Sequence, residues 1–334
     1  MYKERIDLYK KIEEERKSKL LVLVTGDRPG LDTQIAQDII EYCGRHLDSL
    51  STPSFPNKIS LWLYSKGGQT LAGWTIANLI RQFCKEFEVI VFSKAHSTAT
   101  LISLAADNIL MTKQATLGPI DPSINSPLNP QLPGPNPTFR VPISVEDVAG
   151  YVGLAKKEFG IKDPKDLTSI YLKLSESVHP VALGNVYRTR TQIQMLAEKL
   201  LNMRTVPLSV KARKKIIRIL CSESGSHDYT ITRREARTDL GMTIDKPSMD
   251  LYKILKQIHE DISNELELNS VYMPGIYLGS ETQKKYLFKR CLVESADGGS
   301  YKFISEGQIS KINTPQGEFF PDQRIFEGWR KDDG

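Results

Sequence analysis

The chain has 334 residues, of which 45 are lysine or arginine and 40 are aspartate or glutamate, so its net charge at pH 7 is +5. This length can bury a substantial core in one large domain or two smaller ones. So small a charge, spread along the sequence, indicates no nucleic-acid partner. The four cysteines lack the paired spacing of a zinc site or a disulfide framework, which fits a reducing compartment.

The amino-terminal segment, residues 1–19, has a charged helical pattern rather than that of a signal peptide. No apolar run approaches the roughly 18 residues that a membrane span needs. We therefore expect a cytoplasmic chain without a membrane span, with intracellular proteins or peptides as substrates.

Apolar strand patterns alternate with helical patterns in the first part of the chain. Strands are expected at 20–26, 58–64, 89–92 and 109–111, and helices at 33–46, 70–83 and 98–106. Such alternation predicts parallel strands joined by right-handed crossovers. In sheets of this kind, ligands bind beyond the carboxyl ends of the strands.

Two chemically suggestive features follow expected strand ends, Gly67-Gly68 and Ser97. A Gly-Gly turn leaves backbone N–H groups bare and admits a substrate carbonyl, because no Cβ blocks it. A serine at a strand-to-helix junction presents its hydroxyl outward. The pair predicts acyl transfer with Ser97 as nucleophile and the N–H groups of Gly68 and Thr98 as oxyanion hole. The alternatives are a helix-capping serine and a tight loop.

Small residues at Ala72 and Gly73 are expected to let the second helix sit close to the sheet. The second half of the chain is rich in helical patterns, at 144–159, 182–202, 210–221 and 249–266, with Ser144 as the cap of the first. A proline-rich segment, 127–142, predicts an irregular loop that covers a substrate channel or meets a neighbouring subunit.

The tail after residue 272 contains β-prone runs around a turn at 297–299, which predicts a hairpin appendage. We therefore expect a main domain at 1–270 and a β-prone appendage at 271–334.

The motifs together resemble a known fold. The segment 65–73, with its Ser-x-Gly-Gly and Ala-Gly, is followed by Ser97 among small residues and by Leu-Gly-Pro-Ile-Asp-Pro at 117–122. This combination resembles the Clp protease/crotonase fold, an α/β fold of repeated β-β-α units, here with an α-rich second half and a short β-prone tail. Within that fold the chain resembles the serine dehydrogenase proteinase family, which is related to signal peptide peptidase A. Other segments similar to the family are 144–148, 179–184 and 226–236.

The resemblance runs from about residue 15 to about residue 275 and implies a serine peptidase that acts through an acyl-enzyme on peptides or unfolded proteins. It also implies a homo-oligomer. No cofactor is expected, because the sequence shows neither a Gly-x-Gly-x-x-Gly fingerprint nor an obvious lysine motif for pyridoxal phosphate. No metal site is expected either.

The general base is not settled by the resemblance. Clp proteases place a histidine in the stretch that here reads Pro-Ile-Asp-Pro at 119–122, where none occurs. Signal peptide peptidase A uses a lysine, for which Lys156 and Lys157 are the nearest candidates, with Lys162 and Lys165 behind them. Our first choice is His179, because an imidazole suits base chemistry at neutral pH and lies in a family-like segment. Its alternative role is capping or packing at a helix start.

Further histidines and acids are weaker candidates. His96 adjoins Ser97, but neighbouring side chains on a strand point to opposite faces. His227 and Asp228 either fix a loop or reach a site from a neighbouring subunit. Asp121 either orients the base or caps a turn.

Two other functions are compatible with the motifs. One is a non-catalytic oligomeric scaffold or sensor, which the missing histidine favours. The other is a crotonase-like enzyme that stabilises a thioester enolate, although neither a coenzyme A pocket nor the required carboxylate is evident in the sequence.

Overall fold

The computed structural model describes residues 1–121, 123–124, 126–131, 140–223, 226, 228–315 and 317–332. The chain folds into two compact units. The first contains residues 1–118, 200–209 and 230–334, and the second contains residues 119–199 and 210–229. The boundary expected at residue 270 therefore falls inside the first unit.

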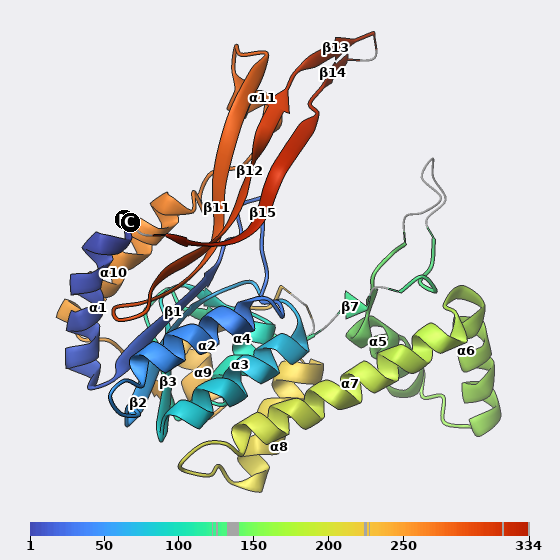
Figure 1. Cartoon of the computed structure of the whole chain (residues 1–334). Coiled ribbons are helices and arrows are strands. Elements are labelled where there is room, and N and C mark those ends of the chain that lie inside the picture. Colours follow the sequence, from blue (N-terminus) through green and yellow to red (C-terminus); the bar gives the residue numbers. More distant parts are fainter. Residues whose placement is uncertain are drawn as a thin grey trace. The chain divides into compact units, whose positions relative to one another are not determined.

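An eight-stranded sheet forms the centre of the first unit. Its strands follow one another in the order β10 (Ile244–Asp245), β5 (Asn108–Met111), β3 (Glu86–Val91), β2 (Lys58–Tyr64), β1 (Lys19–Thr25), β11 (Gln283–Ser295), β12 (Gly299–Ser310) and β15 (Asp322–Asp332). The strands from β10 to β1 are parallel, as predicted for β1, β2, β3 and β5, whereas β10 was not expected. The last three are antiparallel, lie side by side and extend past the parallel strands (Figure 1).

Helices cover both faces of the parallel strands. They are α1 (Tyr2–Arg16), α2 (Ile39–Leu50), α3 (Thr70–Phe83), α4 (Thr98–Leu104) and α10 (Met249–Glu265). Successive side chains of a strand point to opposite faces, so Leu20, Val22 and Val24 of β1 share one cluster with Tyr9 of α1 and Leu255 of α10. The helices α2, α3 and α4 lie on the other side of the sheet (Figure 1). Both faces are buried, which explains the continuous apolar runs.

Helix α2 begins at Ile39, six residues later than the predicted start at Thr33. Amides between Thr33 and Ile39 make hydrogen bonds outside the helix: the Thr33 amide donates to Gly26 O at 2.7 Å, and the Ile35 amide donates to Gly67 O at 2.9 Å. The apolar periodicity of this segment therefore reflects a packed loop rather than a helical turn.

The tail forms the predicted hairpin, since β11 and β12 pair up to Ser295 and Gly299 beside the turn. It is also more than an appendage. Strand β11 pairs with β1, with Val22 opposite Glu294, and so continues the main sheet. An apolar parallel strand with an open edge needs such a partner.

Smaller elements complete the first unit. A three-stranded sheet contains β4 (Lys94–Ala95), β6 (Thr116–Leu117) and β9 (Ile231–Thr232). The other elements are α9 (Arg233–Thr238), α11 (Pro274–Leu278) and the paired strands β13 (Ile312–Thr314) and β14 (Gly317–Phe319). Strand β4 ends one residue before His96, so this small sheet leads the chain directly to the predicted nucleophile.

The second unit is mainly helical. It contains the pair β7 (Ser123–Ile124) and β8 (Ile143–Ser144), then α5 (Val145–Lys157), α6 (Pro164–Ser177), most of α7 (Pro180–Leu201), α8 (Val210–Arg218) and a π-helix at Ile219–Glu223. The Asp147 amide donates to Ser144 Oγ at 3.1 Å, which confirms the predicted cap. Residues 132–139 of the predicted loop, and His227, lie outside the described residues.

Candidate active site

Ser97 lies between β4 and α4 in an unusual backbone conformation. Its φ is 50° and its ψ is −114°, a region that non-glycine residues rarely adopt. The neighbouring His96 amide donates to Ser65 O at 3.0 Å, which aligns this segment with the end of β2. The side chain is partly buried. Such strain persists only where the surrounding structure holds it, and it is concentrated at functional sites.

The Ser97 hydroxyl does not cap the helix that it precedes. A serine in this position usually accepts a hydrogen bond from an amide of the first turn. The side chain of Ser97 makes no such bond, and its hydroxyl has no hydrogen bond within the described part of the chain. The alternative that Ser97 caps helix α4 is therefore wrong, and its hydroxyl is available to bind another group.

Gly67 lies directly against Ser97. A Cβ built on Gly67 would come within 2.8 Å of Ser97 Cβ and 3.2 Å of Ser97 Oγ, and its φ of 125° also favours glycine. The Gly67 amide donates to Ser65 Oγ at 2.9 Å, which holds the turn in place. Only a residue without a side chain permits this approach of the turn to the serine.

Gly68 forms a parallel bridge with Ile35 on one side of the chain. The Ile35 amide donates to Gly67 O at 2.9 Å, and the Gln69 amide donates to Ile35 O at 2.8 Å. In such a ladder the residue between the two bonded neighbours directs its own N–H and C=O to the opposite side. There, Thr98 Oγ1 donates to Gly68 O at 2.7 Å, so the Gly68 N–H faces the side of the chain that carries Thr98.

The amides of Gly68 and Thr98 are both unoccupied by protein acceptors among the described residues. Thr98 is the first residue of α4, and the first amides of a helix have no acceptor within it. Amides without an acceptor are able to stabilise a negative charge that develops near them.

Gly73 serves a different purpose from the one expected. A Cβ at this position would lie 2.4 Å from Thr98 Cγ2 and 3.4 Å from Ile102 Cγ1. Gly73 therefore brings α3 close to α4, and not to the sheet. This packing fixes the position of Thr98 next to the Gly-Gly turn.

His96 points away from the serine side chain, as the alternation of side chains along a strand predicts. Its Nε2 lies 2.9 Å from Thr116 Oγ1 on β6, and a Cβ on Gly118 would come within 3.0 Å of His96 Cβ. The imidazole thus packs into the small sheet.

His179, our first choice for the base, precedes α7 in the second unit and is exposed. The Val181 amide donates to His179 Nδ1 at 3.2 Å. A neutral imidazole whose Nδ1 accepts a hydrogen bond carries its proton on Nε2. In this arrangement neither nitrogen has a lone pair free to take a proton from serine.

Lys156 and Lys157 lie in the last turn of α5, are exposed, and line a cleft of about 880 Å³ within the second unit. Acidic residues of the same cleft include Asp121 and Glu146. Burial raises the pKa of Glu146 above its ordinary value, although Arg190 Nε at 3.2 Å opposes the effect.

Ser97, Gly68 and Thr98 thus meet within the first unit, whereas His179, Lys156 and Lys157 belong to the second. The identity of the base stays a prediction.

Sequence reasoning missed Ile35, whose role depends on a bridge between residues far apart in the chain. It also missed a buried carboxylate, Asp27, which accepts hydrogen bonds from Lys94 Nζ at 2.7 Å and Tyr64 Oη at 2.8 Å. Burial by itself would raise the pKa of Asp27, but these two partners lower it below its ordinary value. The position of Asp27 two residues after a strand end was the available signal.

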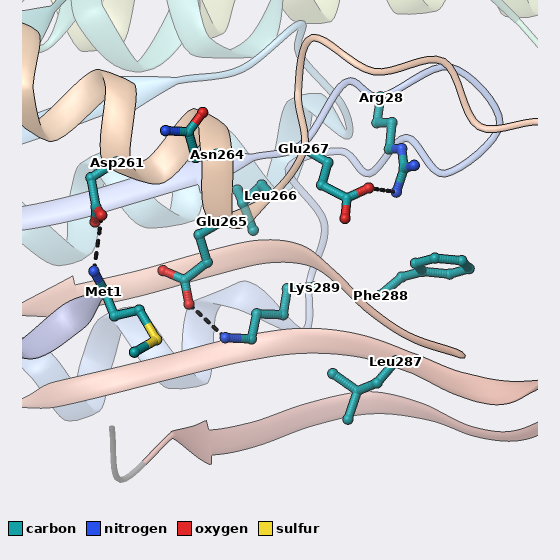
Figure 2. Close-up of a pocket in the computed structure, with 10 residues that line it drawn as sticks. All are labelled: Met1, Arg28, Asp261, Asn264, Glu265, Leu266, Glu267, Leu287, Phe288 and Lys289. Atoms are coloured by element: carbon teal, nitrogen blue, oxygen red, sulfur yellow. Dashed lines mark hydrogen bonds and ion pairs between the residues drawn. The ribbon is translucent and has the colours of Figure 1, made fainter. Parts of the chain in front are cut away.

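The pocket of about 370 Å³ in Figure 2 contains none of the predicted site residues. Its charged groups already pair with one another, Glu265 with Lys289 and Arg28 with Glu267 (Figure 2). Such mutual pairing is typical of a structural network.

The first unit thus combines a mixed α/β fold with a strained serine that lies beside a Gly-Gly turn. Residues 1–132 match the family of ClpP-like SDH-type serine proteinases. The matched segment contains both Gly68 and Ser97. The match confirms the resemblance and the fold class expected from the motifs.

Two curated relatives come from Methanocaldococcus jannaschii. Uncharacterized protein MJ0137 is 29% identical over 202 residues, which are 58% of this chain and 58% of that protein. Uncharacterized protein MJ1495 is 23% identical over 227 residues, which are 68% of this chain and 65% of that protein. The chain thus spans less than two thirds of the length of these relatives.

Similar solved structures include ClpP1 from Listeria monocytogenes, with a TM-score of 0.37 and 18% identity over 73% of this chain and 99% of that one. Another is a mutant of the 1510-N membrane-bound stomatin-specific protease in complex with a substrate peptide, with a TM-score of 0.38 and 14% identity over 65% of this chain and 73% of that one.

Within the described residues, no helix combines the length and apolar character needed to cross a bilayer. The four cysteines are free thiols.

Proposed function

We propose that the protein is a serine peptidase in which Ser97 is the nucleophile and the N–H groups of Gly68 and Thr98 form the oxyanion hole. The observation that carries this proposal is the close contact between Gly67 and Ser97. The backbone of Ser97 is strained, and its hydroxyl has no hydrogen-bond partner among the described residues. The match of residues 1–132 to a serine proteinase family gives independent support.

In this mechanism Ser97 Oγ attacks the carbonyl carbon of the scissile peptide, and the hydroxyl proton passes to the general base. The carbonyl oxygen becomes an oxyanion that accepts hydrogen bonds from the two free amides, each loss of which would cost about 10²-fold or more in rate. Collapse of this intermediate breaks the C–N bond, and the base returns the proton to the leaving amine. Water then hydrolyses the acyl-enzyme by the same steps.

The substrate that fits such a site is an extended peptide. Backbone groups beside Gly67 and Ser97 would pair with a strand-like substrate, a mode of binding in which main-chain hydrogen bonds supply affinity. The class of substrate is therefore a peptide or an unfolded protein segment.

The base is proposed to be His179, Lys156 or Lys157. The capping bond to His179 Nδ1 counts against the histidine in the observed arrangement, since that bond must break before the ring accepts a proton. The lysines are free of this restriction but are exposed.

A fluorophosphonate probe tests the assignment of Ser97. Only an activated serine reacts, so wild-type protein should be labelled at Ser97 and Ser97→Ala should not. The matched control is Ser103→Ala in α4, the helix that follows Ser97, where the hydroxyl donates to Ala99 O at 2.8 Å and should be dispensable for labelling. An unlabelled wild type would favour the non-catalytic scaffold or the crotonase-like alternative.

We also propose that the protein forms a homo-oligomer. Helix α6 buries none of its residues, and it exposes Tyr171 and Leu172. Apolar side chains gathered on an unburied helix are typical of an interface. Analytical ultracentrifugation of the wild type and of a Tyr171→Ser, Leu172→Ser variant would test this, and a monomeric wild type would contradict it.

A further inference from the structure

The segment from Gly26 to Ile35 connects the proposed oxyanion turn with the C-terminal strands. At one end, Ile35 holds both neighbours of Gly68 through the two ladder bonds already described. At the other end, the Gly26 amide donates to Arg290 O at 2.8 Å, and Thr33 Oγ1 donates to the same carbonyl at 2.9 Å. The conformation of the turn therefore depends on a residue of β11.

The Arg290 guanidinium binds the same segment a second time. Its Nε donates to Leu31 O at 2.9 Å, and one terminal nitrogen donates to Asp32 O at 2.8 Å. The other terminal nitrogen lies 2.9 Å from Ser305 Oγ and 3.1 Å from Glu327. A planar fork with fixed donors can hold two consecutive carbonyls in this way, whereas the point charge of a lysine cannot.

A β-bulge explains why Arg290 is free to do this. The register between β11 and β12 shifts between Lys289 and Cys291, so Arg290 is not paired with a β12 residue in the backbone ladder. Bulges redirect a residue out of the ladder. The approach also requires glycine at position 26, where a Cβ would lie 2.4 Å from Arg290 O.

We infer that Arg290 is a positioning residue for the proposed active site, which it reaches through the Leu31–Ile35 backbone. This inference rests on the proposed function and extends it, because it assigns a role to the C-terminal strands. With its carbonyl and its guanidinium, Arg290 fixes the segment whose Ile35 orients the Gly68 N–H. The geometry of the proposed oxyanion hole then depends on β11 as well as on the Gly-Gly turn.

The test measures two quantities in the wild type and in Arg290→Met. The first is the amide hydrogen exchange of Ile35 and Gln69, whose N–H groups form the ladder. The second is the rate of fluorophosphonate labelling at Ser97. We expect exchange about tenfold faster or more, because the segment opens locally. We also expect labelling about tenfold slower or more, because the oxyanion donor is misplaced.

The matched control is Arg324→Met. Arg324 also contacts Glu327, but it contacts no carbonyl of the Gly26–Ile35 segment among the described residues. Both quantities should stay within about twofold of the wild type, as surface ion pairs contribute little. If Arg290→Met fails to fold, Thr33→Val removes the hydroxyl bonds to Arg290 O at 2.9 Å and Gly26 O at 3.2 Å and should change both quantities in the same direction, by less.

Unchanged exchange in Arg290→Met and Thr33→Val would overturn the inference, as would faster exchange with unchanged labelling. A wild type that does not react with the probe would overturn the proposed function itself. The two failures are distinguishable, because only the second concerns the wild type.

Discussion

Ile35 and Gly68 form a single parallel β-bridge, and this pair determines which way the Gly68 N–H points. Ile35 is fully buried and lies in a loop that precedes α2, far in sequence from the Gly-Gly turn. The proposed chemistry therefore depends on a backbone contact between Ile35 and Gly68, and neither of these residues has a reactive side chain.

Replacing Gly68 with alanine should abolish labelling of Ser97. The new Cβ would lie 2.2 Å from Ile35 O and 2.6 Å from Ile35 N, both backbone atoms that cannot move aside cheaply. The φ of 149° adds further strain. Fluorophosphonate labelling measures the effect, at a temperature where circular dichroism shows a folded protein.

Gly184→Ala is the control for this substitution. Gly184 lies within α7, and a Cβ added there would meet no heavy atom of the described residues within 4 Å. Alanine in a helix interior should stabilise the protein by about 1 kcal/mol and leave labelling unchanged. Full reactivity of Gly68→Ala would contradict the oxyanion assignment.

Arg5→Met should destabilise the first unit by about 3–5 kcal/mol, the cost of leaving a buried charge unpaired. Arg5 and Glu294 are both fully buried and lie 2.7 Å apart, and Tyr9 Oη donates to the same carboxylate at 2.6 Å. Urea denaturation measures the change. The exposed pair Lys253 and Asp250 supplies the control, since Lys253→Met should cost less than about 1 kcal/mol. Equal costs would contradict the prediction.

Folding stability should fall as the pH drops from about 6.5 towards 4. Burial lowers the pKa of His46 to about 4, against a hydrogen bond with Val293 O that raises it, and burial likewise lowers the pKa of His259 to about 4. Between these pH values both histidines are protonated in the unfolded chain and neutral in the folded chain. Their protonation therefore lowers the free energy of unfolding, and the more buried His46 contributes about 2–3 kcal/mol to this decrease.

The measurement is a series of urea titrations between pH 4 and pH 8. The variant His46→Gln should show a shallower dependence on pH than the wild type, because one of the two excluded protonations is gone. An identical slope in the variant would show that His46 takes no part.

Replacing the candidate bases one at a time should single out one of them. Loss of the true base should reduce the peptidase rate by about 10²-fold or more. The variants are His179→Gln, Lys156→Met and Lys157→Met, with Lys173→Met on α6 as an exposed control. The dependence of the rate on pH gives a second readout, since the ordinary pKa values of histidine and lysine differ by about four units. Full activity in all three variants would place the base elsewhere.

The sequence sufficed for elements whose signal is local. The apolar run of β1 and the pattern of α3, with bounds Thr70–Phe83, were predicted correctly. Ser97 and the Gly-Gly turn were found because each follows a strand end. Helix α6 was not predicted, since a helix that buries none of its residues lacks a clear core-facing stripe.

The remaining features depend on contacts between distant residues. Nothing near Thr33 shows that its amide is taken by Gly26 O, so the start of α2 was placed too early. The pairing of β11 with β1 joins residues about 270 positions apart, Val22 and Glu294 among them, and no periodicity encodes such a register. The role of Arg290 follows from that register and was equally out of reach.

The pairing of β1 with β11 also affects folding during translation, because the two strands are synthesised at different times. Strand β1 is synthesised well before residues 283–295, which close its outer edge. Until then the nascent chain carries an apolar edge that can join another chain, so a stalled or shortened product is prone to aggregate. The proposed peptidase likewise acquires its oriented amide only after β11 has been synthesised, because Arg290 of that strand holds the segment that contains Ile35.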